Sequence, residues 1–262
     1  MVARSMTIAS TDSGGGAGIM ADLKTFTAMK VFGTAVTVAL TAQNSVEVKS
    51  IFELPLKFIG EEFDAIMEDI GTDSAKTGML YSESIINKIS EKIKQYSVKN
   101  LVIDPVMISK TGAKLLKDDA ISAMKNKLMP LAILVTPNIP EAEVLSGIRI
   151  ENYDDIKKSA KKIYDETGTS VLIKGGHMGT EQSTDILFHD GEFLSYSSPR
   201  FDTKNTHGTG DTLSASIASF LAGGKKLNDA VHLAKEYING AIKNSFPMGR
   251  GYGALNHFWV IK

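Results

Sequence analysis

The chain contains no cysteine, and this absence excludes several classes of protein at once. A chain of 262 residues without cysteine has no disulfide framework and no cysteine-based metal or redox centre. Its five histidines are scattered along the sequence, and none of them has the spacing of a zinc site. Disulfide-rich secreted domains and zinc-finger proteins are therefore excluded.

An excess of charge of either sign is also missing. The 29 Lys and Arg residues nearly balance the 30 Asp and Glu residues, which gives a formal net charge of -1 at pH 7. Proteins that bind nucleic acid usually carry a strongly basic face, so nucleic acid is not an expected partner.

Long hydrophobic runs are absent too. The most apolar stretches, such as 32–42 and 128–135, are far shorter than the roughly 20 residues that span a bilayer. Residues 1–5 are too short and too polar for a signal peptide. With 43% hydrophobic and 23% charged residues, the composition predicts a cytoplasmic protein that binds no membrane and folds as one domain over residues 1–262.

Short apolar segments alternate with helical patterns along the whole chain. The predicted strands are 6–9, 34–40, 101–103, 133–135 and 171–173, followed by a hairpin that turns at Asp190-Gly191. The predicted helices begin near residue 17 and continue with 59–70, 85–93, 120–128, 141–145, 154–166 and 228–243. Another helix has Leu213, Ile217 and Leu221 on one face and stops at Gly223-Gly224. This alternation predicts an α/β fold with a mostly parallel sheet covered on both faces.

Polar side chains stand where strand after strand ends. They are Asp12, Gln43, Lys76, Asp104, Asn138 and Lys174. Taken singly, each fits a solvated loop residue, but ligands of such sheets bind beyond the carboxyl ends of the strands. Together they predict a binding site along one edge of the sheet.

A turn with two glycines, Gly208 and Gly210, opens directly into one of the predicted helices. The first amides of a helix lack intrahelical acceptors and attract an anion, and glycine lets a phosphate approach the backbone closely. Asp211 follows in the same turn. From the turn alone, a helix cap and a catalytic base are equally good interpretations of Asp211.

A second glycine-rich stretch, 14–18, follows the first predicted strand. Its spacing does not fit a dinucleotide fingerprint, and no Gly-Lys-Ser/Thr of a Walker loop follows it. A plain tight turn explains it, and an NAD-dependent oxidoreductase stays only as an alternative.

The anion turn, the polar sheet edge and the adjacent carboxylate together favour phosphoryl transfer. This chemistry depends on positioning, on neutralisation of charge and on a base that takes the proton of the acceptor. Asp211 would be this base, and the amides of Gly208 and Gly210 would form the anion hole.

The sequence resembles the ribokinase-like superfamily, and within it the hydroxymethylpyrimidine and phosphomethylpyrimidine kinases of thiamine biosynthesis. The resemblance runs nearly end to end. The motifs that carry it are Thr11-Asp12-Ser13, 18–26, Ala39-Leu40-Thr41-Ala42-Gln43-Asn44, Lys76-Thr77-Gly78-Met79-Leu80, Asp104-Pro105-Val106-Met107, Thr136-Pro137-Asn138-Ile139-Pro140-Glu141-Ala142, Lys174-Gly175-Gly176-His177 and 205–214. The resemblance implies a three-layer α/β/α sandwich with a central, mostly parallel sheet, and the use of ATP and Mg²⁺.

The resemblance also implies roles for single residues. Gln43 would hydrogen-bond the ring edge of a small-molecule pyrimidine, and Asp22 would contact its hydroxymethyl side. The residues that would pack around the ring are Ala17, Thr41, Met79 and Val106. Asp104 and Lys174 would line the nucleotide side, and Thr209 would contact phosphate.

For the metal, the resemblance points to Asn138 and Glu141, which would hold Mg²⁺ and its waters. A helix cap with an acidic first turn after Pro137 is the alternative interpretation of this pair.

Some positions depart from the family pattern. Pyrimidine kinases usually carry Cys where this chain has Asp211, whereas sugar kinases and many pyridoxal kinases of the superfamily carry Asp. Ser10, Met20 and Thr77 replace the usual Gly, Gln and Ile.

We therefore expect a homodimeric, ATP- and Mg²⁺-dependent kinase for 4-amino-5-hydroxymethyl-2-methylpyrimidine and for its monophosphate. A pyridoxal or pyridoxine kinase is the nearest alternative, and a catalytically silent vitamin-binding module is another.

Overall fold

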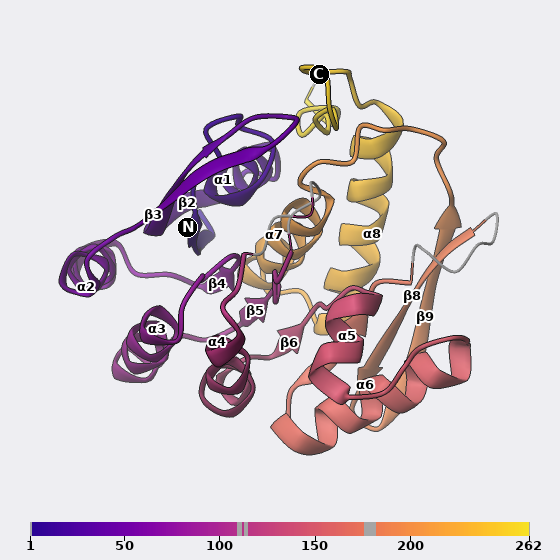
Figure 1. Cartoon of the computed structure of the whole chain (residues 1–262), viewed down its shortest axis with the longest axis horizontal. Coiled ribbons are helices and arrows are strands. Elements are labelled where there is room, and N and C mark those ends of the chain that lie inside the picture. The colour runs from indigo at the N-terminus through magenta and orange to yellow at the C-terminus, as the bar shows by residue number, and fades with distance from the viewer. Residues whose placement is uncertain (1, 109–111, 113–114, 176–181, 262) are drawn as a thin grey trace.

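A computed structural model describes residues 2–108, 112, 115–175 and 182–261 of the chain. Within these residues nine strands form a single sheet in the order β3-β2-β1-β4-β5-β6-β7-β8-β9 (Figure 1). Their bounds are β1 Arg4–Ser10, β2 Phe32–Gln43, β3 Val48–Glu53, β4 Ser74–Thr77, β5 Leu101–Ile103, β6 Leu134–Val135, β7 Ser170–Ile173, β8 Gln182–His189 and β9 Glu192–Pro199.

The middle of the sheet is parallel and its two margins are antiparallel. Strands β2, β1, β4, β5, β6 and β7 run parallel to one another. Strand β3 is antiparallel to β2, and β8 and β9 form the predicted hairpin beside β7. The parallel strands end at one common edge of the sheet, and this edge carries the site described below.

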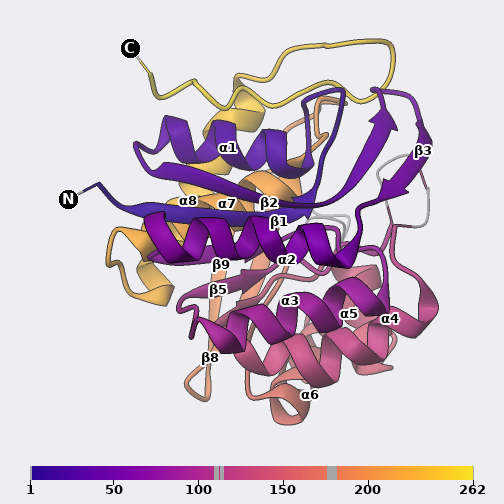
Figure 2. The ribbon, with the colours of Figure 1, turned by 90° about the vertical axis from the view of Figure 1, so that its left-hand side faces the viewer.

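Helices cover both faces of the sheet, as the alternating pattern predicts. Their bounds are α1 Gly18–Ala28, α2 Leu56–Ala65, α3 Glu83–Gln95, α4 Asp118–Ala123, α5 Ile139–Ser146, α6 Tyr153–Thr167, α7 Thr209–Ala222 and α8 Leu227–Lys243. Helices α1, α7 and α8 share one apolar core, and α2 to α6 contribute to the other. Figure 2 shows α1 on one side of the sheet and α2, α3 and α6 on the other.

The central strands supply both cores because successive side chains of a strand point to opposite faces. Val102 of β5 and Leu172 of β7 are buried against α7 and α8, whereas Ile103 and Ile173 are buried on the opposite face. The strands are therefore apolar on both sides, and their polar residues gather at their ends.

The predicted elements agree with the structure except for two strands that the sequence analysis does not predict. One is β4, whose four residues are buried but include Ala75 as their single apolar side chain, so no apolar run marks it as a strand. The other is β3, whose side chains are half-buried or exposed along its whole length. Without one buried face it lacks the alternation that marks a strand, and only its pairing with β2 identifies it. The predicted helix 59–70 begins earlier, at Leu56, and its last turn widens to a π-helix over Ile66–Ile70.

Among the described residues, none of the helices combines the length and the hydropathy that a membrane span requires.

Candidate active site

The common edge of the parallel strands brings together side chains from distant parts of the sequence. The Lys174 ammonium, just after β7, lies 2.8 Å from Asp104 Oδ1, just after β5. The Lys76 ammonium, on β4, lies 2.8 Å from Asp211 Oδ1 on α7. The first helical turn of α7 thus meets the sheet edge that the strand-end residues predict.

Two glycines allow this close meeting. Gly208 is the N-cap residue of α7 with φ = 78°, and a Cβ on it would overlap the carbonyl oxygen of Gly16. A Cβ on Gly210 would lie 2.9 Å from Asp104 Oδ2 and 3.3 Å from Lys174 Nζ. The turn therefore packs backbone against both the first glycine-rich loop and the Asp104–Lys174 pair.

The start of α7 has no side-chain cap. Gly208 offers no side chain, and no side chain bonds to the first amides of the helix as a cap. Thr209 Oγ1 instead donates to the carbonyl of Thr206, at 2.7 Å. The Thr209 amide donates to the carbonyl of Thr206, and the lack of a side-chain cap together with the helix dipole makes this turn suited to an anion such as phosphate.

Asp211 is the third residue of α7 and does not cap the helix. Its carboxylate accepts hydrogen bonds from Lys76 Nζ and from the Gly18 amide, and its side chain is 15% exposed. These contacts exclude the helix-cap interpretation. A carboxylate held beside an anion site is arranged as a base requires.

Lys76 also binds a second carboxylate. Its Nζ lies 3.0 and 2.9 Å from the two oxygens of Asp22 on α1, and Thr7 Oγ1 donates to Asp22 Oδ2 at 2.6 Å. Lys76 and Asp22 are both completely buried. Asp22 therefore has no exposed surface for the predicted contact with a substrate. Its carboxylate oxygens are hydrogen-bonded to Thr7 and Lys76 inside the protein.

The charges of this cluster shift one another's pKa values. Burial raises the pKa of Asp22 to about 7; the charge of Lys76 opposes this shift and that of Asp211 adds to it. Burial also favours a higher pKa for Asp211, but the charge and hydrogen bond of Lys76 outweigh it, so that the pKa of Asp211 lies below its usual value. For Lys76, burial favours a lower pKa, but the charges of Asp211 and Asp22 raise it overall.

The Asp104–Lys174 pair forms a second charged group at the edge. Burial favours a lower pKa for Lys174, but the charges of Asp104 and Glu141 raise it overall. Thr136 Oγ1 lies 3.4 Å from Asp104 Oδ1. A protonated Lys174 that lies next to Gly210 is placed to neutralise an anion at the start of α7.

Asn138 and Glu141 form a capping box at the start of α5. The Glu141 amide donates to Asn138 Oδ1 and the Asn138 amide donates to Glu141 Oε2, both at 2.9 Å. The helix-cap interpretation of this pair is thus confirmed. Burial raises the pKa of Glu141 to about 7, with Lys174 opposing and Asp104 adding to the shift.

Gln43 and the residues predicted to pack around a ring come from several segments of the chain. Gln43 Nε2 lies 3.3 Å from His207 Nε2, and Thr41 Oγ1 lies 3.4 Å from Gln43 Oε1. Ala17 is the N-cap residue of α1, and Met79 is buried with its carbonyl bonded by Ser10. Val106 is half-buried two residues after Asp104.

His207 and Asp12 form a contact that joins two loops. The sequence analysis does not predict this contact. His207 Nε2 lies 2.8 Å from Asp12 Oδ2, and Asp12 also accepts the amides of Gly14, Gly16 and Ala17. Burial favours a higher pKa for Asp12, but the His207 contact and these amides lower it overall. Both residues stand in the quoted motifs, but their contact joins positions 195 residues apart and has no local signal.

His177 and Gly176, which belong to one of the quoted motifs, lie outside the described residues.

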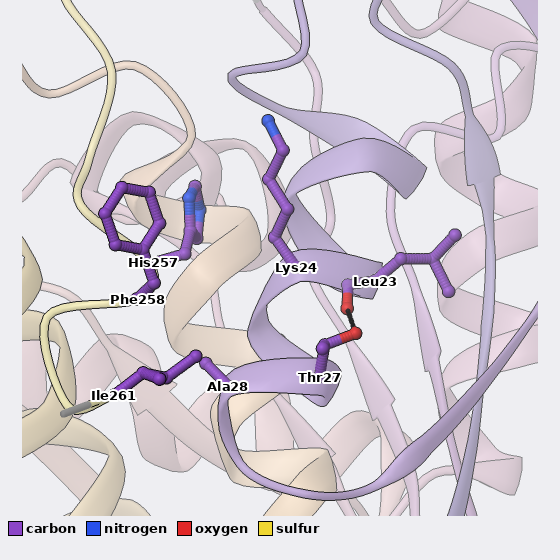
Figure 3. A pocket seen from close by; sticks show the side chains of 7 residues that line it. All are labelled: Leu23, Lys24, Thr27, Ala28, His257, Phe258 and Ile261. Atoms are coloured by element: carbon purple, nitrogen blue, oxygen red, sulfur yellow. Dashed lines mark hydrogen bonds between the residues drawn. The ribbon is translucent and has the colours of Figure 1, made fainter.

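A shallow apolar groove lies between α1 and the C-terminal segment 255–261 (Figure 3). It is lined by Leu23, Lys24, Thr27, Ala28, His257, Phe258 and Ile261. His257 Nε2 lies 3.0 Å from the Oγ1 atom of Thr212, the residue that follows Asp211. The C-terminal segment therefore contacts the first turn of α7 directly.

The sequence matches the model of a family described as phosphomethylpyrimidine kinase over residues 12–256. The thiamine biosynthesis bifunctional protein ThiED of Geobacter sulfurreducens is 46% identical over 252 residues, which are 96% of this chain and 51% of that protein. The chain thus spans about half the length of that relative. The hydroxymethylpyrimidine/phosphomethylpyrimidine kinase of Haemophilus influenzae is 45% identical over 97% of this chain and 96% of its own.

Solved structures show the same fold. An ADP complex of Bacillus subtilis pyridoxal kinase superposes with a TM-score of 0.92 at 37% identity, over 99% of each chain. A phosphomethylpyrimidine kinase from Clostridium difficile 630 superposes with a TM-score of 0.82 at 44% identity, over 92% of this chain and 99% of that chain. The predicted ribokinase-like fold is thereby confirmed.

Proposed function

The chain belongs to the phosphomethylpyrimidine kinase family, and we propose from this premise that it transfers the γ-phosphoryl group of ATP to the hydroxymethyl oxygen of 4-amino-5-hydroxymethyl-2-methylpyrimidine. The monophosphate of this pyrimidine is the second acceptor, and thiamine biosynthesis is the pathway. Family membership removes the NAD-dependent oxidoreductase and the silent binding module from the alternatives.

The observation that supports this chemistry best is the place of Asp211 in the first turn of α7. Its carboxylate lies beside an uncapped helix start and is held by Lys76. In the proposed step Asp211 takes the proton of the alcohol while the alcohol oxygen bonds to the γ-phosphorus. The bond from that phosphorus to the bridging oxygen breaks, and ADP leaves.

The amides of Gly208 and Gly210 bind the migrating phosphoryl group, and Thr209 contacts it from the same turn. Lys174 and Asp104 lie on the nucleotide side, where the Lys174 ammonium offsets phosphate charge. Fixed donors and charges of this kind stabilise negative charge as it develops, with little reorganisation.

Mg²⁺ is the expected cofactor besides ATP, and Asn138 and Glu141 are the residues proposed to hold it. Their amide and carboxylate oxygens suit a hard cation that keeps several waters. Both oxygens of the capping box already accept backbone amides, and Glu141 is buried. This fits contact with the waters of the ion, whose charge stabilises the phosphates when it is bound.

On the acceptor side, Gln43 is proposed to hydrogen-bond the pyrimidine ring edge. Ala17, Thr41, Met79 and Val106 are proposed to pack around the ring. We also propose that residues 1–262 form a single kinase domain, that two chains form a homodimer and that the enzyme works in the cytoplasm.

A pyridoxal kinase is the second candidate, because the superposition with a pyridoxal kinase has the higher TM-score and because Asp211 replaces the usual Cys of pyrimidine kinases. Both substrates carry a hydroxymethyl group on a heteroaromatic ring, so the same base serves either of them.

Parallel turnover assays of the wild-type protein decide between the two. With saturating ATP and Mg²⁺, we expect a higher kcat/KM for the hydroxymethylpyrimidine than for pyridoxal, and measurable phosphorylation of the pyrimidine monophosphate. A higher kcat/KM for pyridoxal would reverse the assignment.

A further inference from the structure

One lysine, Lys76, is shared between two carboxylates, of which one is the proposed base Asp211 and the other, Asp22, has no role in the proposed function. Lys76 Nζ lies 2.8 Å from Asp211 Oδ1 and within 3.0 Å of both oxygens of Asp22. Thr7 Oγ1 donates to Asp22 from the other side, at 2.6 Å. The three charged groups come from β4, α1 and α7, so three separate elements build this cluster.

Stability alone does not account for such a cluster. Lys76 and Asp22 are completely buried, and the desolvation of buried ion pairs often exceeds their mutual attraction. Apolar residues of similar volume would fill the same space without this cost. The charges therefore need another reason, and the partner that lies closest to solvent is Asp211.

The charges themselves suggest that reason. One ammonium cannot neutralise two carboxylates, so the cluster carries a net charge of -1 when both are ionised. A like charge nearby favours proton uptake by a carboxylate, whereas a cation alone opposes it. With Lys76 as its only partner, Asp211 would be a poor base.

We propose that Asp22 is a positioning residue that acts through Lys76 to keep the Asp211 carboxylate oriented and able to accept a proton. This inference rests on the proposed function, because it takes Asp211 as the base. When Asp211 receives the alcohol proton and becomes neutral, Lys76 and Asp22 remain as a neutral ion pair. The γ-phosphoryl group leaves the bridging oxygen of ADP and bonds to the alcohol oxygen in the same step.

Other titratable groups also face Asp211 from the elements around it. They are His207 before α7, Lys174 after β7, Asp104 after β5 and His257 in the C-terminal segment. Lys174 and Asp104 pair with each other, and His207 contacts Asp12. The charges that act most directly on Asp211 are thus those of Lys76, which it contacts, and of Asp22, which contacts the same lysine.

The substitution Asp22→Asn tests the proposal through the pH dependence of kcat/KM. Burial and the charge of Asp211 raise the pKa of Asp22 to about 7, so the wild-type cluster takes up one proton as the pH falls through neutrality. We expect the wild-type rate to fall there. In Asp22→Asn this acid limb moves down by about one pH unit or more and the plateau rate falls, while KM for ATP stays constant.

Thr7→Val is a second variant, which is expected to shift the acid limb in the opposite direction. It removes a hydrogen bond to the ionised form of Asp22, so the acid limb moves to higher pH. Asp64→Asn is the matched control, because Asp64 binds the largely buried Lys92 at 2.7 Å between α2 and α3, away from the sheet edge. The pH profile of this control matches that of the wild type.

Titration of ¹³C-labelled aspartate carboxyl groups by NMR gives a reading that does not depend on turnover. In Asp22→Asn the Asp211 signal, assigned with Asp211→Asn, titrates at lower pH than in the folded wild type. Unchanged titration together with an unchanged acid limb overturns the proposal and leaves the kinase function intact. A wild-type protein that phosphorylates no alcohol would contradict the proposed function instead, and the NMR titration still decides the coupling.

Discussion

Gln43 lies where two loops meet, and its amide is the group proposed to read the ring. Its Nε2 lies close to His207 Nε2, and its backbone amide donates a hydrogen bond to Ser13 Oγ at 2.8 Å. Side-chain and backbone contacts thus fix the orientation of the Gln43 amide. An amide held in this way hydrogen-bonds a planar heterocycle with little loss of entropy.

Gln43→Ala is expected to weaken binding of the pyrimidine by about 1–3 kcal/mol, because a ring donor or acceptor is left unpaired. Calorimetric titration of the pyrimidine into each variant measures the effect, and ATP affinity is expected to stay constant. Gln95→Ala serves as control, since Gln95 ends α3 and contacts Lys92. If the pyrimidine binds equally well to Gln43→Ala and to the wild type, Gln43 does not read the ring.

Single residues of the site differ in how far the sequence reveals them. Gly208, Gly210 and Asp211 stand in one local motif, so their neighbourhood is predictable. The contacts of Lys76 with Asp22 and Asp211 span 54 and 135 residues, and no local pattern encodes them. The sequence thus shows Lys76 as a polar strand end but not the carboxylates that surround it.

At the scale of elements, the C-terminal segment holds the first turn of α7 in place. His257 is buried, its Nε2 meets Thr212 Oγ1, and Tyr237 of α8 donates to its carbonyl oxygen at 2.5 Å. Burial lowers the pKa of His257 to about 4; the charge of Lys24 adds to this shift and that of Asp211 opposes it. This histidine is therefore neutral in the folded protein at neutral pH.

The neutral His257 makes stability depend on pH. Between about 6.5, its ordinary pKa, and about 4, the unfolded chain binds a proton that the folded chain does not. The free energy of unfolding is therefore expected to decrease as the pH is lowered through this range. At pH 5 it is expected to be roughly 2 kcal/mol lower than at neutral pH.

Urea unfolding of His257→Gln at pH 7.5 and pH 5 checks this expectation, because glutamine does not titrate and can still bond to Thr212. We expect the variant to lose less stability between the two values than the wild type does. His232→Gln, an exposed position on α8, is expected to behave as the wild type. Equal losses in wild type and His257→Gln would show that His257 does not cause the pH dependence.

Elements are predictable from sequence where their buried faces are apolar. Strands β1, β2, β5, β6 and β7 and the long helices α3, α6 and α8 follow from apolar patterns. Strand β4 is buried but polar apart from Ala75, so it has no such pattern. Strand β3 lies at the edge of the sheet with no buried face, so its sequence carries no such signal. Its existence depends on pairing with the end of β2, a contact that only the fold creates.

At the scale of the whole molecule, the parallel sheet is what assembles the site. Strand ends that are far apart in sequence reach one edge, and α7 begins there with uncapped amides. The strand-end residues are thus predictable as a group, because a parallel sheet aligns its carboxyl ends. Which of them pair with each other depends on the strand order, which the alternation of elements does not determine.

The central claim is that Asp211 is the base of a phosphoryl transfer at this edge. Asp211→Asn keeps the size of the side chain and removes its basicity. The most direct measurement compares turnover of the hydroxymethylpyrimidine by this variant and by the wild type, together with ATP affinity by calorimetry. Asp229→Asn, which changes an acidic residue in the first turn of α8, is the matched control.

We predict that Asp211→Asn binds ATP as the wild type does but turns over the pyrimidine about 10²-fold or more slowly, while the Asp229→Asn control keeps wild-type turnover. Wild-type turnover by Asp211→Asn would contradict the account.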